Sequence, residues 1–284
     1  MDSQKKFTQS FSLEFFPPKT PKGAENLRNT RNELAELNPA YISVTFGAGG
    51  STQDGTIETV TEIQQAGIPA APHLSCIASS TEQLSSLLKL YQDRGISRIV
   101  ALRGDLPSGM QSPGELRYAN ELVEFIRKET GDFFKIEVAA YPETHPQAAN
   151  ASEDLKNFKR KVDAGANSAI TQYFFNADAY FGFIDGCESL DINIPIVPGI
   201  MPITNYKQLA RFSDACGAEI PRWIRKRLED FGDDIDSIKA FGLDYTIQLC
   251  DRLLSQGAPG IHFYSMNKTE PTKQIWQSLN LKNA

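Results

Sequence analysis

The chain has 284 residues, of which 40% are hydrophobic and 23% are charged, and its formal net charge is -6. The length fits one large domain or two small ones, and the composition is ordinary for a soluble globular protein. The acidic balance, without a long basic block, argues against nucleic acid as a partner. The polar N-terminus and the lack of a long apolar run argue against a signal peptide and a membrane span.

Short apolar strands alternate with amphipathic helical stretches along the chain. Strands are predicted at residues 11–15, 41–45, 70–73, 98–102, 135–140, 168–172, 196–199 and 260–264. Helices are predicted at residues 24–37, 56–66, 81–93, 118–130, 153–164, 178–189, 206–216 and 268–279. Seven of these strand–helix units are spaced by roughly 25–35 residues, as a (β/α)8 barrel requires.

Residues 217–259 interrupt this rhythm. They carry two further helical patterns, at 221–231 and 235–256, which we interpret as extra helices inserted between units 7 and 8. The whole pattern predicts a single (β/α)8 TIM barrel over residues 1–284, serving as one catalytic domain. A doubly wound open sheet uses the same alternation and is the main alternative.

The cysteines and histidines lack redox and metal-binding spacing. The four cysteines are far apart and form no C-x-x-C pair, which indicates reduced thiols in a cytoplasmic protein. The three histidines, His73, His145 and His262, show no H-E-x-x-H or related spacing, so we expect no metal site.

Glu14 is the acidic residue of an apolar stretch at residues 11–18, which ends in Pro17 and Pro18. Because the prolines end the strand, Glu14 is predicted at its carboxyl end, among aromatic rings. Burial in apolar surroundings disfavours the charged carboxylate, so we expect a raised pKa and an ability to donate a proton near neutral pH. A carboxylate turned to solvent at the strand end is the open alternative.

Polar side chains also end most of the other predicted strands. They are Thr45, His73, the run Arg103-Gly104-Asp105, Tyr141 to His145, Thr171-Gln172 and Tyr264. Barrel enzymes carry their chemistry at the carboxyl ends of the strands, so this convergence predicts a site there. Taken alone, the glycine-rich run at 47–50 is typical of a turn, and the basic triplet at 159–161 is typical of a solvated helix face.

Seven motifs together resemble the methylenetetrahydrofolate reductase family in its short bacterial form, over residues 11–279. They are Ser-Leu-Glu-Phe-Phe-Pro-Pro-Lys (12–19), Ser-Val-Thr-Phe-Gly-Ala (43–48), Ala-Pro-His-Leu-Ser-Cys (71–76), Ala-Leu-Arg-Gly-Asp (101–105), Ala-Tyr-Pro-Glu (140–143), Lys-Val-Asp-Ala-Gly-Ala (161–166) and Pro-Gly-Ile (198–200).

The resemblance implies an FAD-bearing barrel, in which NADH reduces the flavin and leaves. Methylenetetrahydrofolate then takes the hydride and becomes 5-methyltetrahydrofolate, a methyl source for methionine synthesis. Glu14 matches the general acid that protonates folate N10 and opens the ring to a 5-iminium cation. Asp105 matches the aspartate that lowers the flavin potential and stabilises this cation. Family members commonly form homo-oligomers; we expect no regulatory domain after the barrel.

The resemblance also supplies binding positions. Those matching the FAD site are Thr45, Phe46, Ala48, His73, Arg103, Gly104, Asp105, Tyr118, Ala119, Tyr141, His145, Asp154, Asn157, Arg160 and Lys161. Those matching the folate and nicotinamide site are Glu14, Gln172, Gln208, Phe212 and Lys268. Phe46 stands where a tyrosine is frequent, and Lys268 stands where the family has an arginine, so a bidentate contact there would become a point charge. The residues do not distinguish NADH from NADPH.

Two other functions use part of the same residues. A non-catalytic pterin- or flavin-binding barrel would keep Thr45, His73 and Arg103 but would not need Glu14 or Asp105. A cofactor-free (β/α)8 lyase or isomerase would use Glu14 and His145 as acid and base, and the purified protein would be colourless.

Overall fold

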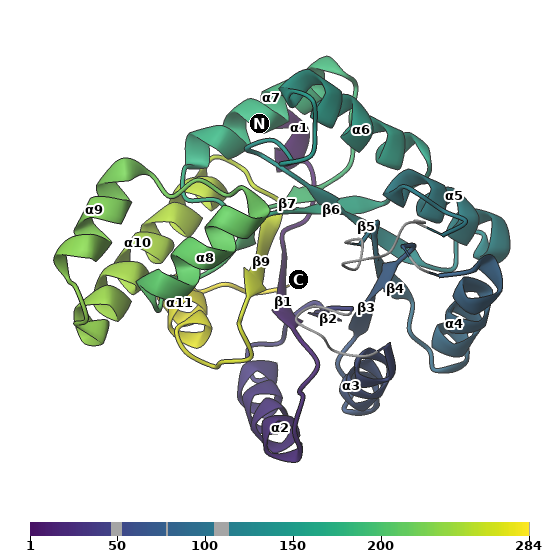
Figure 1. The fold of residues 1–284 in the computed structure, drawn as a ribbon, viewed down its shortest axis with the longest axis horizontal. Coiled ribbons are helices and arrows are strands. Elements are labelled where there is room, and N and C mark those ends of the chain that lie inside the picture. The colour runs from purple at the N-terminus through teal and green to yellow at the C-terminus, as the bar shows by residue number, and fades with distance from the viewer. Residues whose placement is uncertain (47–52, 78, 105–113, 284) are drawn as a thin grey trace.

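The computed structural model describes residues 1–46, 53–77, 79–104 and 114–283 (Figure 1). Its strands are β1 (Ser10–Phe15), β2 (Ile42–Val44), β3 (Ala70–Ser75), β4 (Arg98–Leu102), β5 (Lys135–Ala140), β6 (Ser168–Thr171), β7 (Ile196–Val197), β8 (Gly199–Ile200) and β9 (Gly260–Tyr264). Every pair of neighbouring strands is parallel, in the order β7-β6-β5-β4-β3-β2-β1-β9-β8.

The two ends of this sheet meet at one broken strand. β7 and β8 are the halves of the strand predicted at 196–199, and Pro198, which has no N–H to donate, separates them. The first half pairs with β6 and the second with β9, so the ring of strands is joined. The barrel prediction is therefore confirmed, and the open-sheet alternative is wrong.

The helices lie outside this ring (Figure 1). They are α1 (Asp2–Lys5), α2 (Pro21–Ala35), α3 (Gln53–Gln65), α4 (Thr81–Asp93), α5 (Ala119–Thr130), α6 (Ala151–Asp163), α7 (Ala177–Ser189), α8 (Tyr206–Cys216), α9 (Arg222–Asp230), α10 (Ile235–Ser255) and α11 (Thr272–Ser278). The insertion is confirmed as α9 and α10. The short α1 was not predicted, and the helix predicted from residue 268 begins only at Thr272, which leaves Lys268 in a loop.

Side-chain caps set several helix starts. Ser80 accepts from the Gln83 N–H while the Gln83 side chain accepts from the Ser80 N–H, a capping box at α4. Asn150 and Asn205 cap α6 and α8, and Gly217 ends α8 at a φ of 76°. These caps satisfy backbone groups that a helix end would otherwise leave without partners, and they fix where each helix meets the barrel.

Strand residues alternate between two environments. On β1, Phe11, Leu13 and Phe15 join the main hydrophobic core with the helices, where each buried large side chain contributes about 1.5–3 kcal/mol. Ser12 and Glu14 take the intervening positions and face the barrel interior. This interior combines buried polar residues, Ser12, Ser43, Glu137, Ser168 and His262, with a small apolar cluster of Tyr41, Ala71, Val100 and Ile170.

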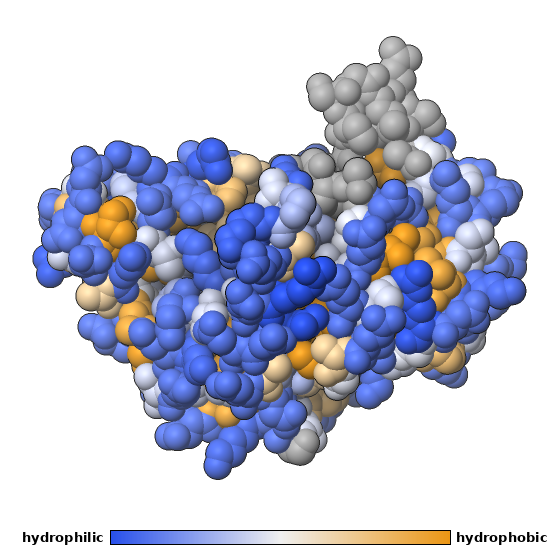
Figure 2. Space-filling model, turned by 90° about the horizontal axis from the view of Figure 1, so that it is seen from below, coloured by the Kyte–Doolittle hydropathy of each residue, from blue (hydrophilic) through white to orange (hydrophobic). Residues whose placement is uncertain are grey.

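The surface is hydrophilic over most of the face shown in Figure 2, with hydrophobic residues interspersed. None of the helices that the structure describes is both long and apolar enough to cross a membrane.

Candidate active site

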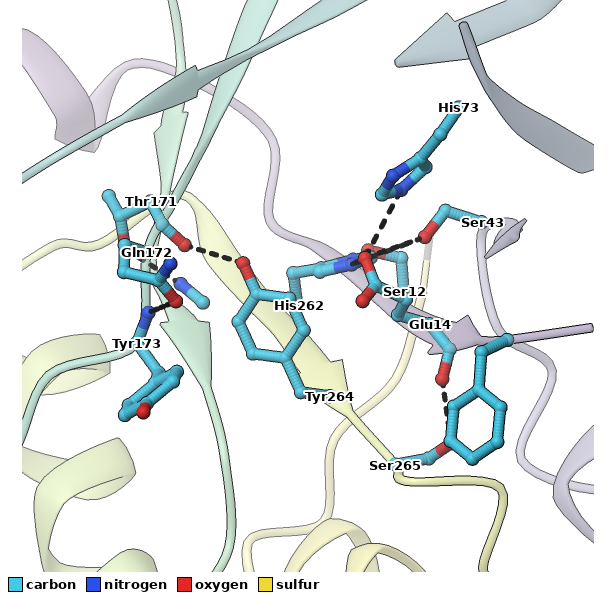
Figure 3. Close-up of polar contacts among 12 residues, drawn as sticks. Ser12, Glu14, Ser43, His73, Thr171, Gln172, Tyr173, His262, Tyr264 and Ser265 are labelled. Atoms are coloured by element: carbon cyan, nitrogen blue, oxygen red, sulfur yellow. Dashed lines mark hydrogen bonds and ion pairs between the residues drawn. The ribbon is translucent and has the colours of Figure 1, made fainter. Parts of the chain in front are cut away.

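Glu14 lies inside the carboxyl end of the barrel, at the centre of a cluster of polar side chains (Figure 3). Parallel register sets it opposite Ser43 of β2 and Tyr264 of β9, and sets Ser12 opposite His262. The Ser265 hydroxyl donates to the backbone carbonyl of Glu14 at 2.7 Å. The strand pairing therefore fixes the place of the carboxyl group.

Two imidazoles face this carboxyl group. Oε2 of Glu14 is 3.1 Å from Nε2 of His73 on β3 and 3.7 Å from Nε2 of His262 on β9. The Ser43 hydroxyl donates to the same oxygen at 3.4 Å. The Glu14 side chain is 16% exposed, so it reaches the open end of the barrel while most of it is buried.

These neighbours correct the expected ionisation of Glu14. Burial does raise the pKa of its carboxyl group, but the charge of His73 and the hydrogen bond with His262 outweigh that effect and hold the pKa at about 2. The sequence predicted aromatic rings around Glu14. On the barrel side this prediction is wrong, because imidazoles and hydroxyls face the carboxyl group. Glu14 is a carboxylate in the resting protein.

A groove of about 720 Å³ opens at the same end of the barrel, at the ends of β4 and β5 and the starts of α5 and α6. It brings together most of the predicted cofactor positions: Arg103, Gly104, Tyr118, Ala119, Tyr141, His145, Asp154, Asn157, Arg160 and Lys161. Its volume lies within the range of cofactor sites. His73 lies in the Glu14 cluster, on the neighbouring strand β3.

The groove carries cationic side chains that suit a phosphate-bearing ligand. Arg103, Arg160 and Lys161 line it from two different elements. Lys161 donates to the Ala139 carbonyl, and burial lowers the pKa of its ammonium group to about 8. An anion beside these groups would restore the charge that burial disfavours, so they fit a diphosphate.

The walls of the groove are held by local contacts. The His145 N–H donates to the Asp154 carboxylate at 2.7 Å, which ties the loop after β5 to α6. The rings of Tyr141 and His145 meet edge to face, with centroids 4.5 Å apart. Tyr118, at the start of α5, is 57% exposed. The groove therefore has a fixed floor and an exposed aromatic edge.

Two features at the ends of β4 and β2 suit a ligand that approaches closely. Gly104 has a φ of +84°, and a Cβ there would lie 1.9 Å from Oγ of Ser75, so only glycine fits. The buried hydroxyl of Thr45 has no hydrogen-bond partner within the described part of the chain, as expected of a group that a ligand satisfies. Phe46 follows Thr45 and is half-buried. Ala48 and Asp105, two further predicted positions, lie outside the described residues.

The predicted substrate positions come from three other parts of the chain: the end of β6, helix α8 and the loop before α11. Gln172 follows β6, and its side-chain oxygen accepts from the Tyr173 N–H at 3.0 Å (Figure 3). Phe212, on α8, is partly buried at the edge of a second hydrophobic cluster, to which Tyr173 belongs. Gln208, half-buried, is one turn earlier on the same helix. Lys268 is exposed in the loop before α11.

Sequence reasoning missed the residues that support Glu14 from within the barrel: Ser12, Ser43 and His262. The sequence did carry a signal for them, the alternation of polar and apolar residues along two strands. It places polar residues on one face of each strand, in Ser12-Leu13-Glu14 and in His262-Phe263-Tyr264. Within the described part of the chain, no group of three or more His, Cys, Asp or Glu residues is arranged to hold a metal ion.

The fold and the site define a (β/α)8-barrel enzyme, with its titratable cluster and its groove at the carboxyl ends of the strands. Residues 1–280 match the family described as methylenetetrahydrofolate reductase. The chain belongs to this family, and it is an oxidoreductase of folate metabolism.

The known proteins that are similar to this chain support its assignment to the family. The 5,10-methylenetetrahydrofolate reductase of Escherichia coli (strain K12) is 41% identical over 95% of this chain and 90% of its own length. The Arabidopsis thaliana protein named methylenetetrahydrofolate reductase (NADH) 1 is 37% identical over 96% of this chain and 48% of its own length.

A solved structure supports the fold. It is an uncharacterized Clostridium thermocellum protein that binds two copies of 5-methyl-5,6,7,8-tetrahydrofolic acid. It has a TM-score of 0.68 at 15% identity, over 98% of this chain and 95% of that chain.

Proposed function

We propose that the protein reduces 5,10-methylenetetrahydrofolate to 5-methyltetrahydrofolate in two half-reactions, with FAD as the bound cofactor and NADH as the electron donor. The observation that carries the proposal is that His73, which faces Glu14, and the start of the cationic groove lie on the paired strands β3 and β4. The product would supply methyl groups for methionine synthesis. This function supersedes the cofactor-free lyase and the non-catalytic barrel.

The groove residues would bind the negative charge of the cofactor at one end and its ring system at the other. Arg103, Arg160 and Lys161 would bind the diphosphate, and Thr45 and His73 would bind the ring end that approaches Glu14. A bound flavin supplies two-electron hydride chemistry that side chains cannot perform. Asp105 would add a negative charge beside it.

Glu14 would deliver the proton that the folate needs. Methylenetetrahydrofolate reacts once N10 is protonated, because the N10–methylene bond then breaks with its electron pair on nitrogen. Glu14 reaches the open end of the barrel and is held by Ser43 and two imidazoles, so it is placed to act as the general acid.

The remaining predicted positions would orient the two substrates in turn. The Gln172 amide offers both donors and acceptors to a pterin, and the Phe212 ring offers a surface on which a pterin or a nicotinamide can stack. One shared surface requires that NAD⁺ leaves before the folate enters, which is ping-pong order. NADH as the donor is supported by the naming of the Arabidopsis relative.

The direct test is product formation by the FAD-reconstituted protein. We expect 5-methyltetrahydrofolate, identified by chromatography, from NADH and methylenetetrahydrofolate, and none when either is omitted. NADPH in place of NADH tests the donor. A protein that cannot be loaded with FAD, or that forms no methyl product when loaded, would contradict the proposal.

A further inference from the structure

Tyr264 spans the open end of the barrel from β9 to β6. Its hydroxyl donates to the backbone carbonyl of Thr171 at 2.8 Å, and its ring lies between Thr171 and Glu14 (Figure 3). On its own strand, Tyr264 is the register partner of Glu14. The residue that follows Thr171 is Gln172, the predicted pterin contact. One side chain therefore connects the strand position beside the proposed acid to the strand end that carries the pterin contact.

The broken strand β7–β8 explains why the Thr171 carbonyl accepts from a side chain. The ladder between β6 and β7 ends before Pro198. After the proline, the Gly199 N–H donates to the side-chain hydroxyl of Thr171, at 2.9 Å. A buried backbone carbonyl needs a donor, and the Tyr264 hydroxyl supplies it here. The break that joins the two ends of the sheet thus creates the bond across the barrel.

The path of the Tyr264 side chain is narrow. A Cβ at Gly199 would lie 2.1 Å from the Thr171 carbonyl oxygen and 2.7 Å from Cε2 of Tyr264, so only glycine leaves room for the ring. Burial and the charge of Glu14 raise the pKa of the Tyr264 phenol well above its ordinary value. The phenol therefore keeps its proton near neutral pH, and the hydrogen bond to Thr171 is present throughout that range.

The proposed reaction requires a fixed separation between Gln172 and Glu14. Gln172 would hold the pterin, while Glu14 would protonate N10, an atom of the ring that is fused to the pterin. Because the two groups act on one rigid ring system, a shift of one relative to the other misplaces the proton, and a misplacement of about 1 Å can slow a reaction about 10²-fold. The Gln172 amide is itself oriented by the Tyr173 N–H at 3.0 Å.

Building on the proposed function, we propose that Tyr264 is a positioning residue for the folate half-reaction. Its hydroxyl holds the end of β6 at a set distance from Glu14, so that a pterin bound at Gln172 presents N10 to the carboxyl group. Tyr264 gives no proton to the folate and forms no bond in the reaction. It acts through the Thr171 carbonyl and the neighbouring Gln172.

The test is Tyr264→Phe, which removes the hydroxyl and keeps the ring. Protein carrying reduced FAD is mixed with increasing methylenetetrahydrofolate, which gives a limiting rate and a folate Kd. We expect the limiting rate to fall about tenfold with the Kd within about threefold of wild type, because Gln172 still contacts the pterin but N10 is misplaced. The pH dependence of the rate should keep its wild-type shape, since no proton carrier is lost. Flavin reduction by NADH should stay within about twofold, since it needs no proton from Glu14.

Three further variants separate positioning from structure. Tyr180→Phe is the matched control: Tyr180 is buried on α7, and its hydroxyl donates to the Ile196 carbonyl of β7 at 2.7 Å. It should lower the urea unfolding midpoint about as much as Tyr264→Phe does but leave the limiting rate unchanged. Gln172→Ala removes the pterin contact itself and should mainly raise the folate Kd. Tyr264→Leu also removes the ring and should be at least as slow as Tyr264→Phe.

The outcomes distinguish this proposal from the proposed function. A wild-type limiting rate in Tyr264→Phe, with a folate half-reaction that Glu14→Gln abolishes, would overturn the role of Tyr264 and leave the proposed function standing. A slow Tyr264→Leu beside a wild-type Tyr264→Phe would assign the effect to the ring and overturn the role of the hydroxyl. Equal slowing of both half-reactions in Tyr264→Phe, or the same slowing in Tyr180→Phe, would mean that the hydroxyl only maintains the barrel. A folate half-reaction that survives both Glu14→Gln and Gln172→Ala would overturn the proposed site itself.

Discussion

Replacing Glu14 with glutamine removes the proton and the charge while nearly keeping the shape of the side chain. The amide oxygen can still accept from Ser43, but the ion pair with His73 at 3.1 Å is lost. The loss of a general acid typically slows a reaction by about 10²–10⁴-fold. We expect that loss in the folate half-reaction, with NADH-dependent flavin reduction within about twofold of wild type, because hydride transfer from NADH needs no proton from Glu14.

The same substitution has a measurable effect on stability. The difference between the ordinary carboxyl pKa of 4.5 and about 2 for Glu14 corresponds to about 3 kcal/mol of favourable interaction in the folded protein. Because the pKa is lowered on folding, this contribution is complete above pH 4.5 and is lost as the pH falls towards 2. Glu14→Gln should therefore be less stable than wild type at neutral pH, and the difference should shrink in acid.

Stopped-flow spectroscopy of each half-reaction, together with urea unfolding at several pH values, measures both effects. Glu143→Gln is the matched control, since Glu143 is another carboxyl group near the open end of the barrel, which accepts from the Glu219 N–H at 2.8 Å and whose pKa burial raises. It should leave both half-reactions unchanged. Equal loss of both half-reactions in Glu14→Gln would refute the general-acid assignment.

Three further substitutions test the groove and the barrel. Lys161→Met should weaken FAD binding about tenfold or more, and wild-type affinity should fall above about pH 8 as the ammonium deprotonates, both measured by fluorescence titration. Gly104→Ala should cost about 2 kcal/mol or more in urea unfolding, because it combines a φ of +84° with a clash on Ser75. Arg98→Met should cost about 3–5 kcal/mol in the same assay, since it leaves the Glu137 carboxylate buried without its partner.

Two control variants and two opposing outcomes sharpen these tests. Gly95→Ala shares a positive φ of +70° but meets no atom within 4 Å, so it should cost less than Gly104→Ala; equal costs would refute the steric argument. Lys207→Ala breaks an exposed pair with Asp233 and should leave the unfolding midpoint unchanged. Unchanged FAD affinity in Lys161→Met, at every pH, would remove that residue from the cofactor site.

The barrel could be predicted because strands and helices alternate at nearly constant spacing, and the groove could be predicted because its residues stand in recognisable motifs. The break at Pro198 could not be predicted from the sequence. It matters because the two halves of the strand pair with different neighbours, β6 and β9, and only the folded barrel shows this. The late start of α11 left Lys268 in a loop for a similar reason, because Pro271 occupies its N-cap position.

The ionisation of Glu14 was predicted wrongly because a local stretch shows only the apolar residues that share its strand. His73 and His262 come from two other strands, and only closure of the barrel brings them to the carboxyl group. The correction changes the chemistry, since a carboxylate at rest must take up a proton before it can donate one. The alternation of polar and apolar residues on β1 and β9 indicates which side chains face the barrel interior. Only the register of the two strands shows that His262 lies near Glu14.

The most direct test of the central claim is the visible spectrum of the FAD-loaded protein under anaerobic conditions, recorded before and after NADH and again after methylenetetrahydrofolate. We predict a flavin spectrum that bleaches with NADH and returns with the folate, as 5-methyltetrahydrofolate forms. A flavin that NADH bleaches but the folate fails to restore, or a protein that cannot be loaded with FAD, would contradict the account.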